Sequence, residues 1–479
     1  MKEVVFLLFL ILVAGCKGTV SSYDKVLNRI GFLVQHGDLN AAHVLSDSLK
    51  GMTRDERTIW KIDSLRDISE RIPLDFSLSE QEMNEKLFKR LHRPYNADTL
   101  SMWDKKGWLE YSVLNGEKRY FNRTDTNLVR IRNFNIRRQE SDSALARSPY
   151  MIFRKEHDEE VIAQSLAGDR TSDPQLLEVI YTLTVYPDVV PEGETIRCWL
   201  PYPKENSPRQ REVYLEGISN ENFVLSPDTC VHRTIYLEGK AEKGKPVVFQ
   251  ISYRYISSGQ YFDPEKIKAL PYDRKSLLYR KYTEEQPPQI CFTSNVRNLA
   301  DSITKGLTDP TDIVRKIYLW FSRYIDWSGA LEYSIIPNIP EYVLGHQRGD
   351  CGMQTFLFMS MLRYKGIPVK WQSGWMMPPH NKNLHDWCEV YYEGTGWVPV
   401  DISYGLNFSD NRKTREFYIS GIDSYRLIIN DGISGNLYPS KKFMRSEPFD
   451  FQRGEVEWKG GNLYFDKWDY EMKITYNNR

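Results

Sequence analysis

The sequence predicts an α+β protein in which a helical region comes first, a β-sandwich follows, and a mixed domain of helices and strands comes third. Three observations lead to this prediction. Apolar residues recur at helical spacing over residues 20–95. Short runs rich in β-branched and aromatic residues, separated by Pro and Gly, fill residues 175–260. An apolar helix and then strand-like runs follow within residues 266–414, and residues 415–479 form a β-rich C-terminal extension.

The composition is that of a folded chain without an excess of either charge. The 479 residues are 41% hydrophobic and 13% aromatic, which is enough for several cores. Lys and Arg together number 64, as do Asp and Glu, so the formal net charge is zero. Nucleic-acid binding needs a basic surface, and the balance therefore argues against such a partner. The length predicts about three domains.

Residues 1–16 have the features of a lipoprotein signal peptide. Lys2 precedes the apolar run 4–13, which is too short to span a bilayer and fits the apolar core of a signal peptide. The run ends in Val13-Ala14-Gly15-Cys16, which resembles a bacterial lipobox. We therefore expect Cys16 to carry lipid and to anchor the protein in the membrane at the bacterial cell envelope, on a periplasmic or outer-membrane surface. A plain secretory signal is the alternative.

Two regions precede the predicted sandwich. Within residues 20–95, Gly37-Asp38 separates two helical runs, which indicates an αα-hairpin. Residues 96–170 are expected to hold a β-hairpin and a helical connector. Asn115-Gly116 marks the hairpin, because both central residues of a type I′ turn need a positive φ. The charged run that follows is expected to be helical, with a break at Pro149.

The cysteines leave two alternatives open. Cys198 and Cys230 fall in the predicted sandwich, and an envelope location would permit a disulfide between them. Buried free thiols are the other reading, and the sequence does not choose between the two. Both readings also apply to Cys291 and Cys388.

The mixed domain contains two helices whose ends the sequence marks. Asp309 can cap a helix whose first turn holds Pro310. Residues 353–364 form a second, strongly apolar and therefore buried helix, which Gly366-Ile367-Pro368 ends. Three strands are expected after it, at residues 369–373, 385–391 and 397–400.

Cys351 lies at the start of the second helix. Unpaired N–H groups and the macrodipole at a helix N-terminus stabilise an anion, so we expect a lowered pKa and an appreciable thiolate fraction there. The same N–H groups can donate to an oxyanion. By itself, however, a cysteine at this position is as well explained by a structural role.

His385 and Asp401 can complete an activated nucleophile with this thiol. Alternation along the strand puts His385 on the side of Trp387, and Asp386 on the other. An imidazole facing the helix start can act as a general base, and Asp401 can accept from the other ring nitrogen and fix the tautomer. Each residue alone is more often structural; their joint occurrence favours chemistry.

Three sequence blocks resemble the transglutaminase-like (transglutaminase core) superfamily of papain-like thiol enzymes. They are Arg348-Gly349-Asp350-Cys351 with its apolar helix, His385-x-Trp387-x-Glu389-Val390-Tyr391, and Gly394-x-Gly396-Trp397-Val398-Pro399-Val400-Asp401. The resemblance implies a papain-like core in which Cys351 is the nucleophile, His385 the base and later the acid, and Asp401 the orienting group. It also implies attack on a carboxamide or peptide carbonyl, through an acyl-thioester that passes to water or to an amine.

The resemblance implies a protein or peptide substrate and no cofactor. An acidic calcium loop is missing from the sequence. Gln347 and Trp327 lie upstream of the cysteine and are the candidate oxyanion donors. A zinc site is not expected, although Cys351, His385 and Cys388 are metal-ligand types. Alternation puts His385 and Cys388 on opposite faces of one strand, and no paired ligand motif is present.

Two functions from different classes follow. The first is a thiol-dependent hydrolase or acyltransferase of protein amides, with protease or amidase activity favoured over cross-linking. The second is a catalytically weak surface lipoprotein that binds envelope glycan or a protein partner. The aromatic residues of 415–479 could form a glycan platform, but packing on the catalytic domain is the simpler interpretation.

Overall fold

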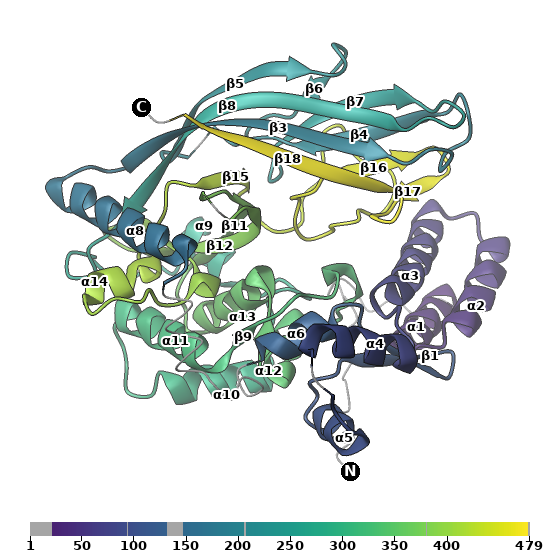
Figure 1. The fold of residues 1–479 in the computed structure, drawn as a ribbon, viewed down its shortest axis with the longest axis horizontal. Helices are drawn as coiled ribbons and strands as arrows, with labels where there is room; N and C mark the ends of the chain where they lie inside the picture. The colour runs from purple at the N-terminus through teal and green to yellow at the C-terminus, as the bar shows by residue number, and fades with distance from the viewer. Residues whose placement is uncertain (1–21, 93, 132–146, 206, 380, 478–479) are drawn as a thin grey trace. The chain divides into compact units, whose positions relative to one another are not determined.

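The computed structural model describes most of the chain (Figure 1). The described residues are 22–92, 94–131, 147–205, 207–379 and 381–477. The predicted signal peptide and Cys16 lie outside them, so the lipid anchor stays a prediction. Helices and strands are mixed, and the α+β class is confirmed. None of the helices in the described ranges combines the length and the apolar character that crossing a membrane requires.

The chain divides into two compact units. The first comprises Met1–Asn135 and Ser328–Asn338, and the second Ile136–Trp327 and Ile339–Arg479. The helices of the first unit are α1 (Ser22–Gln35), α2 (Leu39–Met52), α3 (Glu56–Asp75), α4 (Glu80–Leu91), α5 (Ala97–Lys105), α6 (Thr124–Arg130) and the short η1 (Tyr333–Ile335). Side-chain caps define several of their starts. At α4, Ser79 accepts from the backbone of Glu82 while the Glu82 side chain accepts from the backbone of Ser79.

Gly37-Asp38 separates α1 from α2, as the helical spacing predicts. The predicted hairpin is also present, as β1 (Tyr111–Leu114) paired antiparallel with β2 (Glu117–Tyr120). The turn residues Asn115 and Gly116 have φ values of 48° and 88°, so both adopt the positive φ that a type I′ turn requires. The local turn chemistry was therefore sufficient to predict this element.

Two antiparallel sheets form the sandwich in the second unit. One has the order β14-β8-β3-β18, with β5 also paired to β8, and the other has the order β17-β16-β4-β7-β6. Six strands of the sandwich come from one continuous stretch of the chain. They are β3 (Ser172–Val185), β4 (Thr195–Pro201), β5 (Gln210–Ile218), β6 (Val224–Leu225), β7 (Thr234–Lys240) and β8 (Val247–Tyr261). Side chains from both sheets, including Leu183, Trp199 and Tyr253, share one buried core.

The C-terminal residues complete both sheets, whereas the sequence grouped them as a separate extension. The strands concerned are β14 (Gly421–Ile422), β16 (Glu455–Trp458), β17 (Gly461–Leu463) and β18 (Trp468–Asn477). β18 pairs with β3 along its whole length, and β16 pairs with β4. Such pairings join residues nearly three hundred positions apart, and no local pattern encodes them. Figure 1 shows the yellow C-terminal strands beside the teal ones.

A third sheet and several helices make up the rest of this unit. The sheet has the order β13-β12-β11-β15, formed by β11 (Val369–Met376), β12 (Asn383–Tyr392), β13 (Gly396–Val400) and β15 (Arg426–Asn430). The helices are α8 (Pro149–Ala167), α9 (Leu277–Thr283), α10 (Ser294–Ile303), α11 (Pro310–Tyr324), α12 (Ile339–His346), α13 (Cys351–Tyr364) and α14 (Arg412–Arg415). α13 packs against β11 and β12.

Predicted element ends agree with this arrangement in most places. Asp309 caps α11 by accepting from the backbone of Thr311 and Asp312, with Pro310 in the first turn. Pro149 is the first residue of α8 and follows the Ser148 cap, and the part of the predicted helical run before residue 147 lies outside the described residues. The amide hydrogen that proline lacks is not needed at that position.

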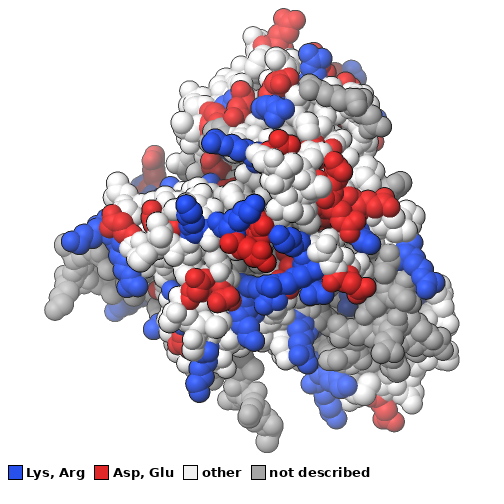
Figure 2. Space-filling model, turned by 90° about the vertical axis from the view of Figure 1, so that its left-hand side faces the viewer, with Lys and Arg blue, Asp and Glu red and all other residues white. Residues whose placement is uncertain are grey.

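The remaining sequence alternatives concern cysteines, aromatics and charges. Cys198, Cys230, Cys291, Cys351 and Cys388 all carry free thiols. Several C-terminal aromatics, among them Phe417, Tyr418 and Trp468, are buried, which agrees with a packing role. Figure 2 shows cationic and anionic side chains interspersed over one face of the molecule, as expected for a chain without net charge.

Candidate active site

Cys351 is the first residue of α13, as the sequence predicts. The Asp350 carboxylate accepts from the backbone N–H of Met353 at 3.0 Å and caps the helix. The first N–H groups of a helix have no intrahelical partner, so those of Cys351 and Gly352 remain candidates for an oxyanion. From Gly352 to Arg363 the helix is buried, which holds its N-terminus in place.

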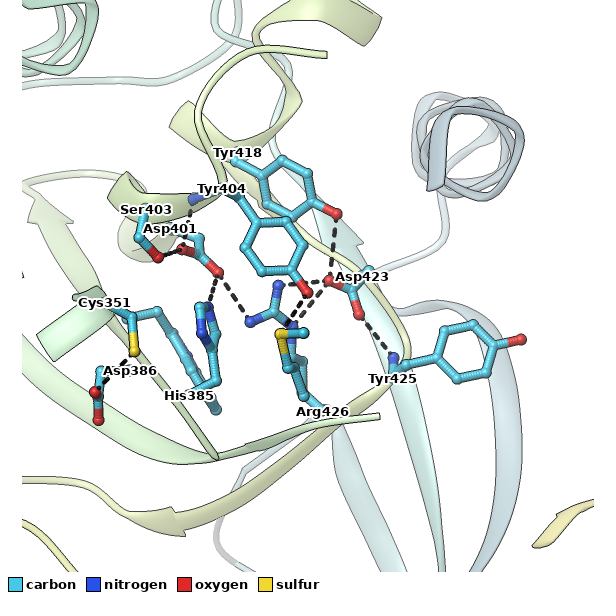
Figure 3. Close-up of polar contacts among 12 residues, drawn as sticks. Cys351, His385, Asp386, Asp401, Ser403, Tyr404, Tyr418, Asp423, Tyr425 and Arg426 are labelled. Atoms are coloured by element: carbon cyan, nitrogen blue, oxygen red, sulfur yellow. Dashed lines mark hydrogen bonds and ion pairs between the residues drawn. The ribbon is translucent and has the colours of Figure 1, made fainter. Parts of the chain in front are cut away.

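His385 and Asp401 meet across neighbouring strands (Figure 3). His385 lies near the start of β12, and Asp401 follows β13 directly. The His385 Nε2 atom is 2.7 Å from Oδ2 of Asp401. A carboxylate can only accept, so Nε2 carries the proton and the neutral ring has its lone pair on Nδ1. Nδ1 has no hydrogen-bond partner in the described part of the chain, and it is the nitrogen available to a thiol.

Two aromatic rings fix the imidazole. The Tyr404 ring meets it edge-on with centroids 5.0 Å apart, and the Trp387 ring stacks on it at 6.0 Å. Trp387 is held in turn by a 2.8 Å hydrogen bond from its indole N–H to Gln372. Burial lowers the pKa of His385, so the ring is neutral at pH 7 and can accept a proton.

Arg426 lies behind the Asp401 carboxylate. Its Nη1 is 2.8 Å from Oδ2 of Asp401, while its Nε and Nη2 donate to Oδ2 of Asp423 at 2.8 and 2.6 Å. Figure 3 shows the guanidinium between the two carboxylates. Arg426 also lies over the Tyr404 ring, 4.3 Å from its centroid. The arrangement is a buried row of alternating charges that ends at His385.

These charges keep both carboxylates ionised. Burial alone would raise the pKa of Asp401, but the charges of His385 and Arg426 outweigh it and lower that pKa. Burial likewise opposes ionisation of Asp423, and Arg426 nevertheless lowers its pKa to about 2. Because Arg426 shares the Asp401 carboxylate, less of that negative charge is available to raise the pKa of His385.

Close approach of β15 places Arg426 there. β11 and β15 shift register between Ser373 and Gly374. A Cβ atom at Gly374 would lie 1.9 Å from the carbonyl oxygen of Leu427, so only glycine allows this contact. The sequence analysis did not identify Arg426. The signal that could have found it is an arginine directly before the apolar run Leu427-Ile428-Ile429, because a charge buried with such a strand needs partners.

The thiol itself differs from the sequence expectation. Its Sγ donates to Oδ2 of Asp386 at 3.2 Å, and among the residues that the structure describes it forms no hydrogen bond with His385. Burial raises the pKa of Cys351 well above its ordinary value, and the charge of Asp350 and the hydrogen bond from the thiol to Asp386 add to the effect. The predicted lowering was wrong, because these effects outweigh the helix N-terminus. Figure 3 shows the Cys351 sulfur turned toward Asp386, with the His385 ring beside Cys351.

The two candidate oxyanion residues, Trp327 and Gln347, lie upstream of Cys351. Trp327, in β9 (Asp326–Trp327), pairs in register with Gly349 of β10 (Arg348–Gly349), two residues before Cys351. The Gln347 side chain is exposed, and its backbone has a φ of 53°. Both remain candidates by position only.

Metal ligation finds no support in the geometry. Across the described residues, no group of three or more His, Cys, Asp or Glu side chains is arranged to hold a metal ion. The Cys388 thiol donates to the backbone oxygen of Val400 at 3.6 Å.

Residues 297–402 match the model of the transglutaminase-like superfamily, and this range contains Cys351, His385 and Asp401. The chain contains a transglutaminase-like domain. Helices α10 to α13 and strands β11 to β13 lie within or close to the matched range. No curated protein matches the chain.

Solved structures similar to the chain include a proposed cysteine protease from Cytophaga hutchinsonii. That structure has 12% identity and a TM-score of 0.42, and the match covers 64% of this chain and 93% of that one. The periplasmic domain of TgpA from Pseudomonas aeruginosa has 15% identity and a TM-score of 0.26, with 50% and 90% covered. A proposed protease from Parabacteroides distasonis has 10% identity and a TM-score of 0.20, with 54% and 68% covered.

Proposed function

We propose that the transglutaminase-like domain is a thiol-dependent hydrolase of protein or peptide amides, with Cys351 as nucleophile. One observation carries the proposal most directly. The Asp401 carboxylate accepts a hydrogen bond from Nε2 of His385 at 2.7 Å, so Nδ1 of His385 is left to accept a proton. Asp386, the next residue along the chain, is the one that the Cys351 thiol contacts. A histidine with a purely structural role does not require a proton acceptor at Nδ1 near a cysteine at a helix start, whereas an activated thiol does.

The first half of the proposed reaction forms an acyl-thioester. The thiol rotates from Asp386 toward His385, the Sγ proton passes to Nδ1, and the sulfur attacks the carbonyl carbon. Negative charge develops on the carbonyl oxygen, where N–H groups at the start of α13 can donate. The imidazolium then gives its proton to the leaving nitrogen, the C–N bond breaks, and ammonia or an amine departs.

The second half returns the enzyme to its starting state. His385 takes a proton from water, the hydroxide oxygen attacks the thioester carbonyl, and the C–S bond breaks to release a carboxylic acid. Sulfur regains its proton from the imidazolium. A lysine amine in place of water would give a cross-link instead. We favour water, because the site residue Cys351 is partly accessible to solvent and water is the most abundant acceptor.

We also propose that the protein is a lipoprotein of the bacterial cell envelope, anchored at Cys16. The proposal is supported by the lipobox-like ending of the N-terminal apolar run. Its substrates would then be envelope proteins or peptides. Palmitate labelling of cells that express wild-type protein or Cys16→Ala tests the anchor: label should appear only on the wild type.

A catalytically weak binding protein is the second candidate. The thiol's hydrogen bond to Asp386 and its raised pKa favour this alternative, because the resting sulfur is neither ionised nor bonded to the base. The partner would be envelope glycan or another envelope protein.

One experiment separates the candidates. Envelope proteins are incubated with wild type or with Cys351→Ala, and amide changes are mapped by mass spectrometry. We expect new carboxylates or new chain ends with wild type alone, from deamidation or cleavage respectively. Isopeptide-linked peptides would reassign the acceptor to an amine. Identical maps for wild type and variant would contradict an enzyme and favour the binding protein.

A further inference from the structure

The contact between the Cys351 thiol and Asp386 has no part in the reaction proposed above. Sγ lies 3.2 Å from Oδ2 of Asp386. Asp386 is 2% exposed. A buried acid in contact with a nucleophile affects its ionisation and its direction, so its own protonation state matters.

The irregular segment 431–454 holds the Asp386 side chain in place through a hydrogen bond. Gln452 donates through Nε2 to Oδ1 of Asp386 and to the backbone oxygen of His385, each at 2.8 Å. Two buried glutamates of β16 hold this segment. Glu455 accepts from the backbone of Ser446 and Glu447, and Glu457 accepts from the backbone just upstream of them. The segment therefore reaches the site with a defined geometry.

Asp450 of the same segment forms a carboxyl pair with Asp386. Ser373, which faces Asp386 across β11 and β12, donates its hydroxyl to Asp450, and the two buried carboxyl groups are close enough to affect each other's pKa. Two buried carboxyl groups so close together cannot both be ionised, so they share one proton. Asp450 accepts from the Ser373 hydroxyl, from Nδ2 of Asn430 at 3.0 Å and from its neighbour's N–H at 2.8 Å.

Those three donors favour the charge on Asp450 and leave the proton on Asp386. Burial raises the pKa of Asp386 well above its ordinary value and that of Asp450 to about 6. Two other acids face the pair. Asp350 raises the pKa of Asp386 and favours the proton there, whereas Glu447, itself paired with Arg453, raises the pKa of Asp450 and opposes the charge on it.

We propose that Asp386, kept protonated by Asp450, is a positioning residue for the Cys351 thiol. As a neutral acid it accepts the S–H bond and directs the sulfur without placing a negative charge beside it. During attack the sulfur proton goes to Nδ1 of His385, and Asp386 keeps its own. The inference rests on the proposed function and adds a residue to the same site.

Two isosteric variants test where the charge lies. At pH 7 the pair carries one negative charge in wild type, and in Asp386→Asn that charge stays on Asp450 while the amide reproduces the neutral acid. Asp450→Asn removes the charge that helps to keep Asp386 protonated. Asp386 is then the one group of the pair that can ionise, and its charge beside the sulfur raises the pKa of the thiol. The thiolate is the reactive form, so iodoacetamide should alkylate Cys351 about tenfold more slowly for each unit of that rise.

We therefore expect Asp386→Asn to react within about twofold of wild type and Asp450→Asn about tenfold more slowly, with peptide mapping at Cys351 as the readout. Cys230, partly exposed and far along the chain, serves as the internal control with an unchanged rate. Slowing in Asp386→Asn equal to that in Asp450→Asn would overturn the proposal, because loss of packing would then explain both.

A second measurement covers an Asp450→Asn variant that fails to fold. The infrared difference spectrum of wild type minus Asp386→Asn at pH 7 should contain the carbonyl band of a protonated carboxylic acid. Asp158, whose pKa burial raises to about 7, contributes equally to both spectra and cancels. A difference spectrum without this band would overturn the assignment of the proton. Neither measurement needs a substrate, so each outcome is independent of whether the protein is an enzyme.

Discussion

Replacing Arg426 by Met should destabilise the second unit and leave two buried carboxylates without their cation. Met keeps much of the side-chain volume, so the change removes mainly the charge and its hydrogen bonds. The lost contacts are those from the guanidinium to Asp401 and to Asp423, all at 2.6–2.8 Å. Arg426 is 1% exposed, so water cannot replace it without rearrangement.

The size of the effect follows from the buried pairs. The lowering of the Asp423 pKa from 3.8 to about 2 corresponds to about 2 kcal/mol of stability at neutral pH. Without Arg426, burial raises that pKa instead, and Asp401 loses one of its two partners. Removing one member of a buried ion pair typically costs about 3–5 kcal/mol, and we expect a loss in that range at pH 7.

The loss of unfolding free energy in Arg426→Met should depend on pH. In wild type, Asp423 stabilises the fold above its unfolded-state pKa, and this contribution is lost as pH falls toward 2. In Arg426→Met the pKa of Asp423 is raised, so the penalty is absent at low pH and grows as pH rises through the new value. The difference in unfolding free energy should therefore be smaller at pH 4 than at pH 7.

Urea unfolding followed by tryptophan fluorescence measures this difference. Trp371, Trp375 and Trp387 are buried in the same unit and report on it. Arg412→Met is the matched control, because that side chain is 62% exposed and its partner Glu416 keeps both hydrogen bonds from Arg315. It should cost less than about 0.5 kcal/mol. Equal losses for both variants, or a loss that does not change between pH 4 and pH 7, would refute the charge argument.

Three further predictions concern the same site. Asp401→Asn should lower turnover by about 10³–10⁴-fold with little change in KM, because an amide would favour the wrong His385 tautomer; an unchanged turnover number would exclude the role. The acidic limb of the pH–rate profile should lie below pH ~6.5, since burial lowers the pKa of His385; a limb above this value would contradict that shift. Gly374→Ala should push β15 from β11 and reduce thermal stability; an unchanged Tm would show that the contact can relax.

Local patterns were sufficient for the parts of the site that lie within short stretches of sequence. Cys351 at a helix start is visible from the Asp350 cap and the apolar run after it. The two strands that present His385 and Asp401 are adjacent in sequence and joined by a short turn, so their pairing could be expected. The type I′ turn at Asn115-Gly116 is a similar case, because backbone strain alone selects those residues.

Residues that control the ionisation of the site were not predictable in this way. Alternation placed Asp386 on the opposite side of β12 from His385, and only the packing of α13 against that strand brings it to the sulfur. Its partners Asp450 and Gln452 come from an irregular segment whose course depends on buried glutamates of β16. No periodicity describes such a segment.

By itself, the sequence determined the helices, the turns and the order of thiol, imidazole and carboxylate, because these depend on capping, backbone conformation and side-chain periodicity over a few residues. Tertiary structure alone decided the electrostatics. Whether the thiol is ionised, which carboxyl group carries the proton and why Asp401 stays charged depend on burial and on charges from β15 and the C-terminal segment. Coulomb interactions in a buried site act between groups close in space, whatever their separation along the chain.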